Sequence, residues 1–309
     1  MSDLATCVAA SGVAPGTQRL QWYPWVARAN AEGVSVRSWD DAAPGSQADE
    51  RVALPGTEPA THLAGCGRWL LLGAGSRLLC WDAGPVRAPP ETLGRLPGQI
   101  TALCAIEREG IGELLAGDDR GCVHHYTHCE GRWWVLPGLS LTAPVRALAG
   151  WGRPPRDAQG RPIGPLALCT PDELLFINAP SITHRFPAQD PALLAWCGAR
   201  VCVGGGGAPG LRALDPASGR EDVLLDGRRR RPTALAYDAE RERTVAAVQV
   251  LNPGLVPTGC ELWVWDDRLV PVRRTELQLP RFAHIMHIGW WQDELLLVDQ
   301  QGAVHREPN

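Results

Sequence analysis

The densest group of potential metal ligands in the sequence is the run Cys122–Cys129, which reads CVHHYTHC. Zinc prefers cysteine and histidine, so this run could carry metal chemistry. On a β-strand alternate side chains face opposite ways, which puts Cys122, His124, Tyr126 and His128 on one face, about 6.5–7 Å from one neighbour to the next. They could therefore hold a metal only with a ligand from another strand. Cys122, His124 and His128 are the metal candidates, and we expect neither a bound metal nor another cofactor.

Catalytic groups in a recognisable arrangement are missing from the sequence. All 30 basic residues are arginine, so chemistry that needs a lysine is excluded, including Schiff bases and the P-loop. A Gly-x-Ser-x-Gly motif is absent. The paired acids Asp40–Asp41, Asp118–Asp119 and Asp266–Asp267 lie in expected turns, where aspartate caps backbone amides. We predict that the protein is not an enzyme.

The densest charge feature is the run of four arginines Arg228, Arg229, Arg230 and Arg231. Guanidinium groups bind carboxylates through two parallel hydrogen bonds, so this run could dock an acidic segment of a partner. The alternative is a solvated loop tip, since exposed charge pairs contribute little. Direct contact with nucleic acid is not expected outside a larger complex, because the net charge is −4 and no aromatic stacking motif lies beside the arginines.

A second candidate contact is the pair Trp133 and Trp134, which starts an expected outer strand. Alternation along that strand turns one of the two indole rings toward solvent or a partner, where it could anchor an interface. We predict a partner-binding set of these two tryptophans, the arginine run, and the turn residues Asp118, Asp119 and Arg120.

The elements that position these residues are short strands. Apolar runs rich in Val, Leu and Trp alternate with turns that contain Gly, Pro or Asp-Gly, and helical periodicity is nearly absent. One apolar segment recurs about every 40–50 residues, which is the spacing of a four-stranded propeller blade. The copies are Arg19–Trp22, Thr61–Cys66, Ile100–Cys104, Val145–Trp151, Ala192–Trp196, Thr233–Tyr237 and Ile285–Trp290.

A Trp-Asp dipeptide closes the third expected strand in three of these units, at Trp39–Asp40, Trp81–Asp82 and Trp265–Asp266. In these features the chain resembles a divergent WD-repeat β-propeller over nearly its whole length. The companion Gly-His dipeptide of that family is missing from every unit. The resemblance implies an all-β fold of radiating blades, with specificity carried by loops. The resemblance also implies a role, because bacterial propellers of this kind are often accessory subunits of ATPase-containing or immune-type assemblies. The use of arginine in place of lysine fits a GC-rich bacterial genome.

We predict one domain over residues 1–309, a seven-bladed propeller, with six or eight blades as alternatives. The expected blades are about 17–58, 59–98, 99–142, 143–190, 191–231, 232–281 and 282–309. The strand Leu4–Ala10 is expected to supply the fourth strand of the last blade and to close the ring, which removes open sheet edges. A pair of two-sheet sandwiches would not explain the repeat.

The resemblance also implies which loops share a face. Its top face would gather the arginine run with 73–76, 118–120, 204–210, 251–259 and 300–301, and the insertion Gly152–Gly164 would lie opposite. The glycines Gly204–Gly207 have no following Lys-Ser/Thr and no helix, so we interpret them as a turn and not as a phosphate cradle.

The composition of the chain predicts its cellular compartment, and the resemblance to WD-repeat propellers predicts its function. The sequence shows neither a signal-peptide pattern nor an apolar run of membrane-spanning length, and ten scattered cysteines suit a reducing cytoplasm. We predict a cytoplasmic scaffold for protein–protein interactions, an accessory subunit of a bacterial ATPase-containing or immune-type assembly with separately encoded partners. The alternative is a propeller hydrolase or lactonase with a metal in its channel, which needs converging acidic or His side chains.

Overall fold

The fold is taken from a computed structural model, which describes most of the chain beyond residue 60 and four strands before it. The described residues are 5–9, 25–30, 33–38, 50–52, 54, 60–66, 69–82, 89–108, 111–129, 131–150, 159, 164, 166–178, 181–205, 210–238, 241–280, 282–291, 294–300 and 303–308. Every regular element within them is a β-strand, which confirms the all-β prediction.

Two compact units divide the chain, Met1–Pro144 and Val145–Asn309. Unit 1 holds three four-stranded sheets. Their strands are β1 (Ala5–Ala9), β2 (Trp25–Asn30), β3 (Gly33–Ser38) and β4 (Glu50–Val52); β5 (Ala60–Cys66), β6 (Trp69–Ala74), β7 (Arg77–Asp82) and β8 (Glu91–Arg95); and β9 (Ile100–Arg108), β10 (Ile111–Asp118), β11 (Cys122–Cys129) and β12 (Arg132–Ser140).

Unit 2 holds three four-stranded sheets and a last sheet of three strands. The four-stranded sheets contain β13 (Ala147–Gly150), β14 (Leu166–Cys169), β15 (Glu173–Asn178) and β16 (Ser181–Pro187); β17 (Leu193–Cys197), β18 (Arg200–Gly204), β19 (Leu211–Leu214) and β20 (Glu221–Leu225); and β21 (Arg230–Asp238), β22 (Arg243–Leu251), β23 (Pro257–Trp265) and β24 (Pro271–Leu277). The last sheet contains β25 (Ile285–Trp291), β26 (Glu294–Asp299) and β27 (Val304–Pro308).

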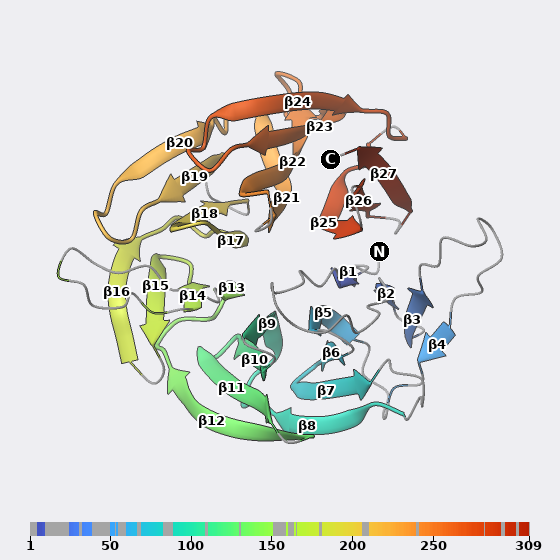
Figure 1. The fold of residues 1–309 in the computed structure, drawn as a ribbon, viewed down its shortest axis with the longest axis vertical. Coiled ribbons are helices and arrows are strands. Elements are labelled where there is room, and N and C mark those ends of the chain that lie inside the picture. The colour runs from blue at the N-terminus through green and yellow to red at the C-terminus, as the bar shows by residue number, and fades with distance from the viewer. Residues whose placement is uncertain are drawn as a thin grey trace. The chain divides into compact units, whose positions relative to one another are not determined.

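Each sheet is an antiparallel meander in which the strands follow one another in chain order, as Figure 1 shows. Short turns between apolar runs favour this local pairing, because antiparallel neighbours need only a tight connection. Successive sheets approach each other mainly through their first strands, β1, β5 and β9 in unit 1 and β13, β17, β21 and β25 in unit 2. The sheets of each unit therefore fan out from their first strands.

The N-terminal strand lies in a different sheet from the one predicted. Ala5–Ala9 pairs with Trp25–Asn30, from Ala5 opposite Ala29 to Ala9 opposite Trp25. It thus completes the first sheet and not the last, so the expected pairing of Leu4–Ala10 with the C-terminal strands is wrong. The physical reason is local. Among the described residues the first repeat supplies the three strands β2, β3 and β4, and pairing with β2 closes a much shorter loop than pairing with the end of the chain.

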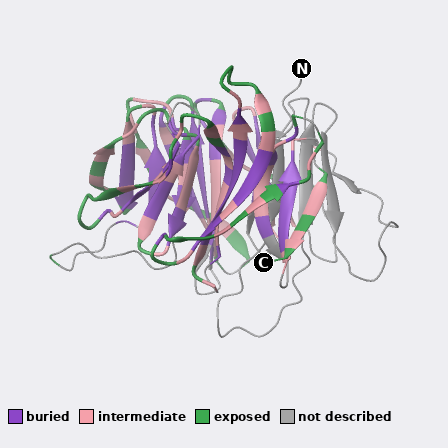
Figure 2. Cartoon of the chain, turned by 90° about the horizontal axis from the view of Figure 1, so that it is seen from above, coloured by how far each residue is buried: buried purple, intermediate pink, exposed green. Residues whose placement is uncertain are grey.

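In the sheets from β5 onward, the core consists of the middle strands, which are buried on both faces, whereas the outermost strands are more exposed (Figure 2). Burial of both faces explains why these strands read as continuous apolar runs, as in Trp69–Ala74 and Glu173–Asn178. Apolar clusters form between neighbouring sheets. In one of them the ring of Phe176 on β15 lies 5.5 Å from that of Trp196 on β17 and 5.7 Å from that of Phe186 on β16.

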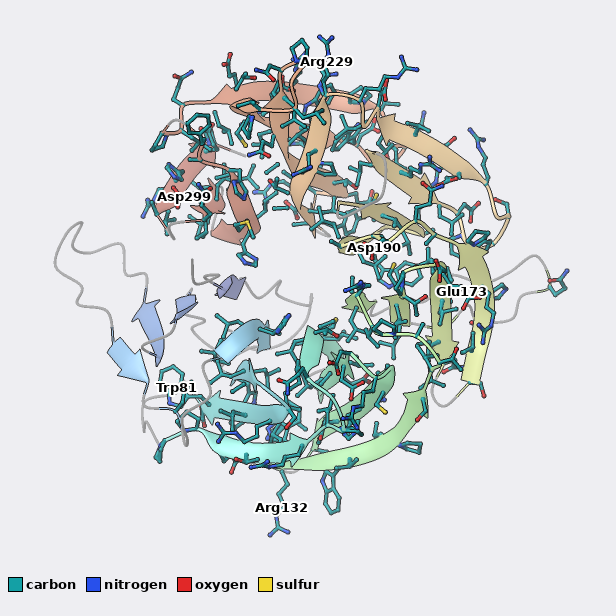
Figure 3. The ribbon with its side chains drawn as sticks, turned by 180° about the vertical axis from the view of Figure 1, so that it is seen from behind. Trp81, Arg132, Glu173, Asp190, Arg229 and Asp299 are labelled. Atoms are coloured by element: carbon teal, nitrogen blue, oxygen red, sulfur yellow. The ribbon has the colours of Figure 1, made fainter. Side chains whose placement is uncertain are left out.

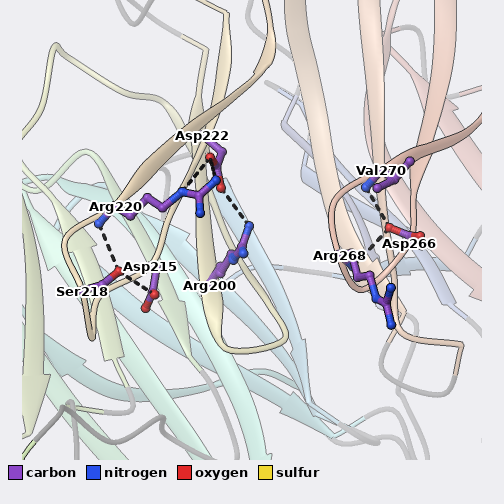
Figure 4. Close-up of polar contacts among 8 residues, drawn as sticks. All are labelled: Arg200, Asp215, Ser218, Arg220, Asp222, Asp266, Arg268 and Val270. Carbon is purple, nitrogen blue, oxygen red and sulfur yellow. Dashed lines mark hydrogen bonds and ion pairs between the residues drawn. The ribbon is translucent and has the colours of Figure 1, made fainter.

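In the Trp-Asp dipeptide at Trp265–Asp266, the tryptophan packs in the core and the aspartate caps the turn that follows β23. Trp265 is buried at the end of β23. The Asp266 carboxylate accepts hydrogen bonds from the backbone N–H groups of Arg268, at 3.1 Å, and Val270, at 2.7 Å (Figure 4). Asp215 holds the equivalent turn after β19 by accepting a bond from Ala217 N–H at 2.9 Å. Capping of turn amides by aspartate is therefore confirmed at Asp266.

Several sequence features lie outside the described residues. They include Trp39–Asp40, Asp41, the glycines Gly206 and Gly207, and the insertion Gly152–Gly164 apart from Gln159 and Gly164.

Packing between β15 and β17 yields a stability prediction. Replacing Phe176 with Ala removes a fully buried ring that contacts two other rings, and we expect the free energy of unfolding to fall by about 3–5 kcal/mol. Denaturant unfolding followed by circular dichroism measures this loss. Val223→Ala, at an exposed position on β20, is the matched control and should change it by less than about 0.5 kcal/mol. Equal losses for both variants would contradict the assignment of the core.

Candidate functional site

The arginine run lies at the turn between two sheets of unit 2. Arg228 and Arg229 occupy the turn after β20, and Arg230 and Arg231 begin β21. The turn is fixed by its backbone, since Leu251 N–H at the end of β22 donates to the Arg229 carbonyl at 2.9 Å. Figure 3 shows Arg229 at the outer margin of this unit. The backbone bond places the arginine run beside the turn that joins β22 to β23.

Only one of the four arginines is built into the sheet. Arg230 Nε lies 3.5 Å from the Glu261 carboxylate on β23, and Arg274 on β24 donates to the same carboxylate. The guanidinium carbons of Arg230 and Arg274 lie 5.5 Å and 5.2 Å from the centroid of the Trp263 ring, which stacks on Trp265. Both arginines therefore combine an ion pair with a cation–π contact.

Glu261 is a buried carboxylate that this cluster keeps ionised. Burial acts to raise its pKa, but hydrogen bonds from Arg274 and from Trp263 Nε1, at 2.8 Å, together with the charge of Arg230, outweigh burial and lower the pKa below its ordinary value. The bond to Glu261 in turn raises the pKa of Arg274. Arg230 is therefore committed to a structural role, because removing it would weaken the compensation of a buried charge.

The other three arginines are available on the surface. Arg228 lies 3.8 Å from Asp226, but both side chains are largely exposed, at 91% and 68%. Within the part of the chain that the structure describes, Arg229 and Arg231 are exposed and have no acidic partner. Exposed guanidinium groups without partners keep all their donors for an external carboxylate.

An exposed apolar tip, Leu255 and Val256, lies at the neighbouring β22–β23 turn. Asn252 builds this turn, since its carboxamide oxygen accepts from Val256 N–H at 2.9 Å and its carbonyl accepts from Leu255 N–H at 2.9 Å. Leu255 is held at φ +61°, a left-handed conformation unusual for leucine, with 65% of its surface exposed. Sequence reasoning placed 251–259 on the same face as the arginines but did not single out Leu255. The Asn-Pro-Gly turn signal before it was the available clue.

Asp118 must be removed from the predicted partner-binding set. It is fully buried, and its carboxylate accepts bonds from the backbone N–H groups of Gly98 at 2.8 Å, Arg120 at 3.0 Å and Cys122 at 2.7 Å. Asp118 therefore ties the connection before β9 to the β10–β11 turn. Asp119 and Arg120 are exposed, although the Asp119 carboxylate is engaged by Gln99 N–H at 2.8 Å.

A second buried aspartate that accepts a turn N–H group is Asp299 at the end of β26, which the sequence analysis did not predict. Asp299 is buried and accepts bonds from Ala303 N–H at 2.9 Å and from His305 Nε2 at 3.1 Å. Asp118 and Asp299 both end the second strand of their sheet, three residues before a glycine, so this spacing was the available sequence signal.

The two tryptophans of β12 have different surroundings. Trp133 packs against His128, with ring centroids 5.1 Å apart, and against Trp69 at 6.0 Å. Trp134 is 51% exposed, and its Nε1 donates to the Cys129 carbonyl at 3.4 Å. One indole ring therefore faces outward, as the alternation along the strand predicts.

The metal candidates on β11 are used in other ways. His128 packs between the rings of Trp69 and Trp133, while the His124 ring faces Tyr126, whose hydroxyl lies 3.5 Å from His124 Nδ1. Across the described residues, no three His, Cys, Asp or Glu side chains come together in a way that could hold a metal ion. Sharing a strand face does not make Cys122, His124 and His128 converge.

Two histidines lie on first strands of sheets, where a catalytic base could be placed. Desolvation by burial lowers the pKa of His287 on β25 to about 4, and it also lowers the pKa of His62 on β5 against a hydrogen bond with Thr101. Both imidazoles are therefore neutral at pH 7. His284, the other member of the His-x-x-His pair, precedes β25, and its backbone N–H donates to the Gln300 side chain at 2.6 Å.

Comparison with known proteins defines the fold and leaves the family open. No family model and no curated protein matches the sequence. Among solved structures, the chain resembles BBS1N in its complex with ARL6DN, with a TM-score of 0.65, 16% identity, and coverage of 93% of this chain and 88% of the other. A chain of the Mitotic Checkpoint Complex matches with a TM-score of 0.65 and 14% identity over 99% of this chain and 93% of the other.

A third similar structure is the Pan2 WD40 domain of Neurospora crassa, with a TM-score of 0.63, 11% identity, and coverage of 91% of this chain and 84% of that domain. At these identities the likeness concerns the fold alone. The chain has a β-propeller fold, similar to that of the Pan2 WD40 domain, as its recurring apolar segment predicted. Among the residues described, no helix has the length and apolar character that crossing a membrane requires.

The two neighbouring aspartates of the β10–β11 turn give a matched test of burial. Asp118→Ala leaves three backbone N–H groups without their acceptor, so we expect the free energy of unfolding to fall by about 2–4 kcal/mol. Asp119→Ala removes an exposed carboxylate and should cost less than about 1 kcal/mol. Equilibrium denaturation of both variants decides the matter, and a similar loss in the two would refute the structural role of Asp118.

Histidine burial predicts a pH dependence of stability. An unfolded histidine has a pKa of about 6.5, whereas that of His287 is about 4 in the folded chain, so the unfolded state binds more protons between these values. Stability is therefore fully present above pH 6.5 and falls toward pH 4, by up to about 3 kcal/mol from His287. Chemical denaturation of His287→Gln across this range should show a flatter profile than the parent chain. An unchanged profile would contradict burial of a neutral imidazole.

Proposed function

We propose that the protein is a non-catalytic scaffold for protein–protein interactions, and that its arginine turn binds an acidic segment of a partner. The observation that carries the proposal is a pair of exposed arginines, Arg229 and Arg231, for which the described residues supply no acidic partner, in a chain whose net charge is negative. A protein of net charge −4 would not attract acidic segments by its overall charge, so local attraction has to come from such a cluster.

The chemistry of the turn favours carboxylates. Arg228, Arg229 and Arg231 begin from a rigid base, because the Arg229 carbonyl is bonded to Leu251 N–H and Arg230 is anchored on Glu261. Rigid presentation lowers the entropy lost on binding. Each charge-assisted hydrogen bond to a partner carboxylate is worth about 1.5–3 kcal/mol when the pair is shielded from water.

The apolar tip adds shielding and specificity. Leu255 and Val256 stand beside the arginine turn with 65% and 45% of their surfaces exposed. A partner segment that places an apolar side chain on this tip and acidic side chains next to it would bury the tip and exclude water from the guanidinium–carboxylate pairs. The proposed ligand is therefore an acidic segment with an adjacent apolar residue.

The similar structures support a function in which this chain binds a partner protein within a larger assembly. Two of the similar structures are complexes, BBS1N with ARL6DN and the Mitotic Checkpoint Complex. We propose separately encoded partners in a bacterial assembly of the ATPase-containing or immune type, located in the cytoplasm. Cys122, the exposed Cys129, Cys169, Cys197, Cys202 and Cys260 are free thiols, which supports a reducing compartment.

A charge-matched pair of triple variants tests the arginine turn. Arg228→Ser, Arg229→Ser and Arg231→Ser together should lower capture of the native partner from source cells at least about tenfold, because the carboxylate-binding groups are lost. Arg230 is kept, since it balances the buried Glu261. The control removes the same charge elsewhere in unit 2, with Arg185→Ser, Arg212→Ser and Arg306→Ser, all in exposed ion pairs.

Quantitative mass spectrometry of captured proteins at low and high salt measures the effect, and capture by the parent chain should fall as salt rises. A second arm, Leu255→Asn, removes the apolar side chain but keeps a residue that tolerates positive φ, so capture should fall while stability stays within about 1 kcal/mol. Unchanged capture by the arginine triple variant would overturn the proposed site. An equal loss in the control triple variant would show that only net charge matters.

A further inference from the structure

The outer strand β12 of unit 1 presents an open sheet edge. It is the last strand of its sheet, and no other strand pairs with its outer side in the part of the chain that the structure describes. Its first residue, Arg132, projects away from the sheet (Figure 3). Gly131 before it adopts φ +76°, and a Cβ built there would meet nothing within 4 Å, so the space around the start of the strand is open.

The composition of β12 differs from that of the other outer strands. Natural proteins protect such edges with charged side chains. Charged residues occur at exposed positions in β8, β16, β20, β24 and β27; they are Glu91, Arg95, Arg185, Glu221, Arg274, Glu276 and Arg306. In β12 the stretch Trp133–Ser140 has no charged residue. Arg132 at its start and Pro137 are the protective residues of this strand, and the stretch between them, Trp133–Leu136, carries neither a charge nor a proline.

Two large apolar side chains are exposed at successive positions of this edge, one on each face of the sheet. Trp134 is 51% and Val135 69% exposed, and as successive residues of a strand they face opposite sides of the sheet. The Trp134 ring is oriented by its hydrogen bond to the Cys129 carbonyl, so little freedom is lost when a partner covers it. Arg132, on the same side as Trp134, is exposed and has no ion-pair partner among the described residues.

We propose that β12 pairs antiparallel with β12 of a second copy of this chain, with Trp134 opposite its own counterpart. A two-fold axis at Trp134 places Arg132 opposite Leu136 of the second copy and lets its guanidinium reach the second Trp134 ring, two positions along the strand on the same face, as a cation–π contact. The two Arg132 residues are then four positions apart along the strand, about 14 Å. Parallel pairing in register would bring them together, and their repulsion selects the antiparallel arrangement.

The length of the pairing follows from the strand. β12 pairs regularly with β11 from Arg132 to Leu136, and the register shifts beyond that point. Pro137 has no N–H to donate, so the shared ladder ends there. A contact of about five residues on each side is small, and its two indole rings supply most of the buried area. The dimer is accordingly weak and depends on concentration.

Sedimentation velocity of the full chain tests the proposal. From about 1 to about 200 µM, where a small interface associates, the parent chain should shift from monomer to dimer. Val135→Glu places a charge in the middle of the paired edge and should raise the dissociation constant at least about tenfold. Val223→Glu is the matched control, because Val223 is equally exposed, at 67%, on the outer strand β20, and it should leave the dimer unchanged.

Trp134→Ser, which removes the central ring contact, should also yield monomer, and circular dichroism of each variant reports whether it is folded. A parent chain that stays monomeric over the whole range overturns the proposal. So does a dimer that survives both Val135→Glu and Trp134→Ser, or one that Val223→Glu disrupts equally. The test does not involve the arginine turn, so its result is independent of the proposed partner site.

Discussion

The backbone N–H groups where the chain passes into a new sheet need acceptors, and the way they are satisfied shapes the rest of this structure. Before β9 the buried Asp118 carboxylate accepts the Gly98 N–H, and Asp119 accepts the Gln99 N–H. Before β25 the Gln300 side chain accepts the His284 N–H. In each case a side chain from the turn after the second strand fixes the incoming connection, because unsatisfied buried amides are costly. A Cβ at Gly98 would lie 2.1 Å from the Asp119 carboxylate, so a larger residue there would have to displace this side chain from its bond with Gln99.

The turn before β21 is fixed by the backbone instead, through Leu251 N–H and the Arg229 carbonyl. This difference has a consequence for the surface. Before β9 the Asp118 carboxylate accepts backbone N–H groups, so it is not available to bind a partner protein. Before β21 a backbone hydrogen bond fixes the turn, so the side chains of Arg228, Arg229 and Arg231 remain on the surface. Of the four arginines, Arg230 alone turns inward to Glu261. The same argument separates Trp133, used in packing with His128 and Trp69, from the exposed Trp134.

Local patterning was enough to predict the strands and the type of fold. The recurring apolar segment, the Asp-Gly type turns and Trp265–Asp266 all act over a few residues, and the structure places them in antiparallel meanders with Asp266 capping its turn. The exposed ring at Trp134 followed from strand alternation. The sheet joined by Ala5–Ala9 could not be predicted in this way, because any apolar strand can pair with several edges and loop closure decides among them.

The sequence by itself determined an all-β propeller without lysine chemistry, the candidate run Arg228–Arg231 and the outward position of one tryptophan, since these depend on residue type and on the two-residue period of a strand. Only the tertiary structure decided which charged side chains are exposed and which are buried or paired within the fold. Asp118 and Asp119 are adjacent in the chain, yet one is buried and the other exposed, and Arg230 differs from its neighbours by contacts with Glu261 and Trp263 on another strand. Burial and ion pairing depend on what the fold brings within a few ångströms of a side chain, and no local pattern specifies those neighbours.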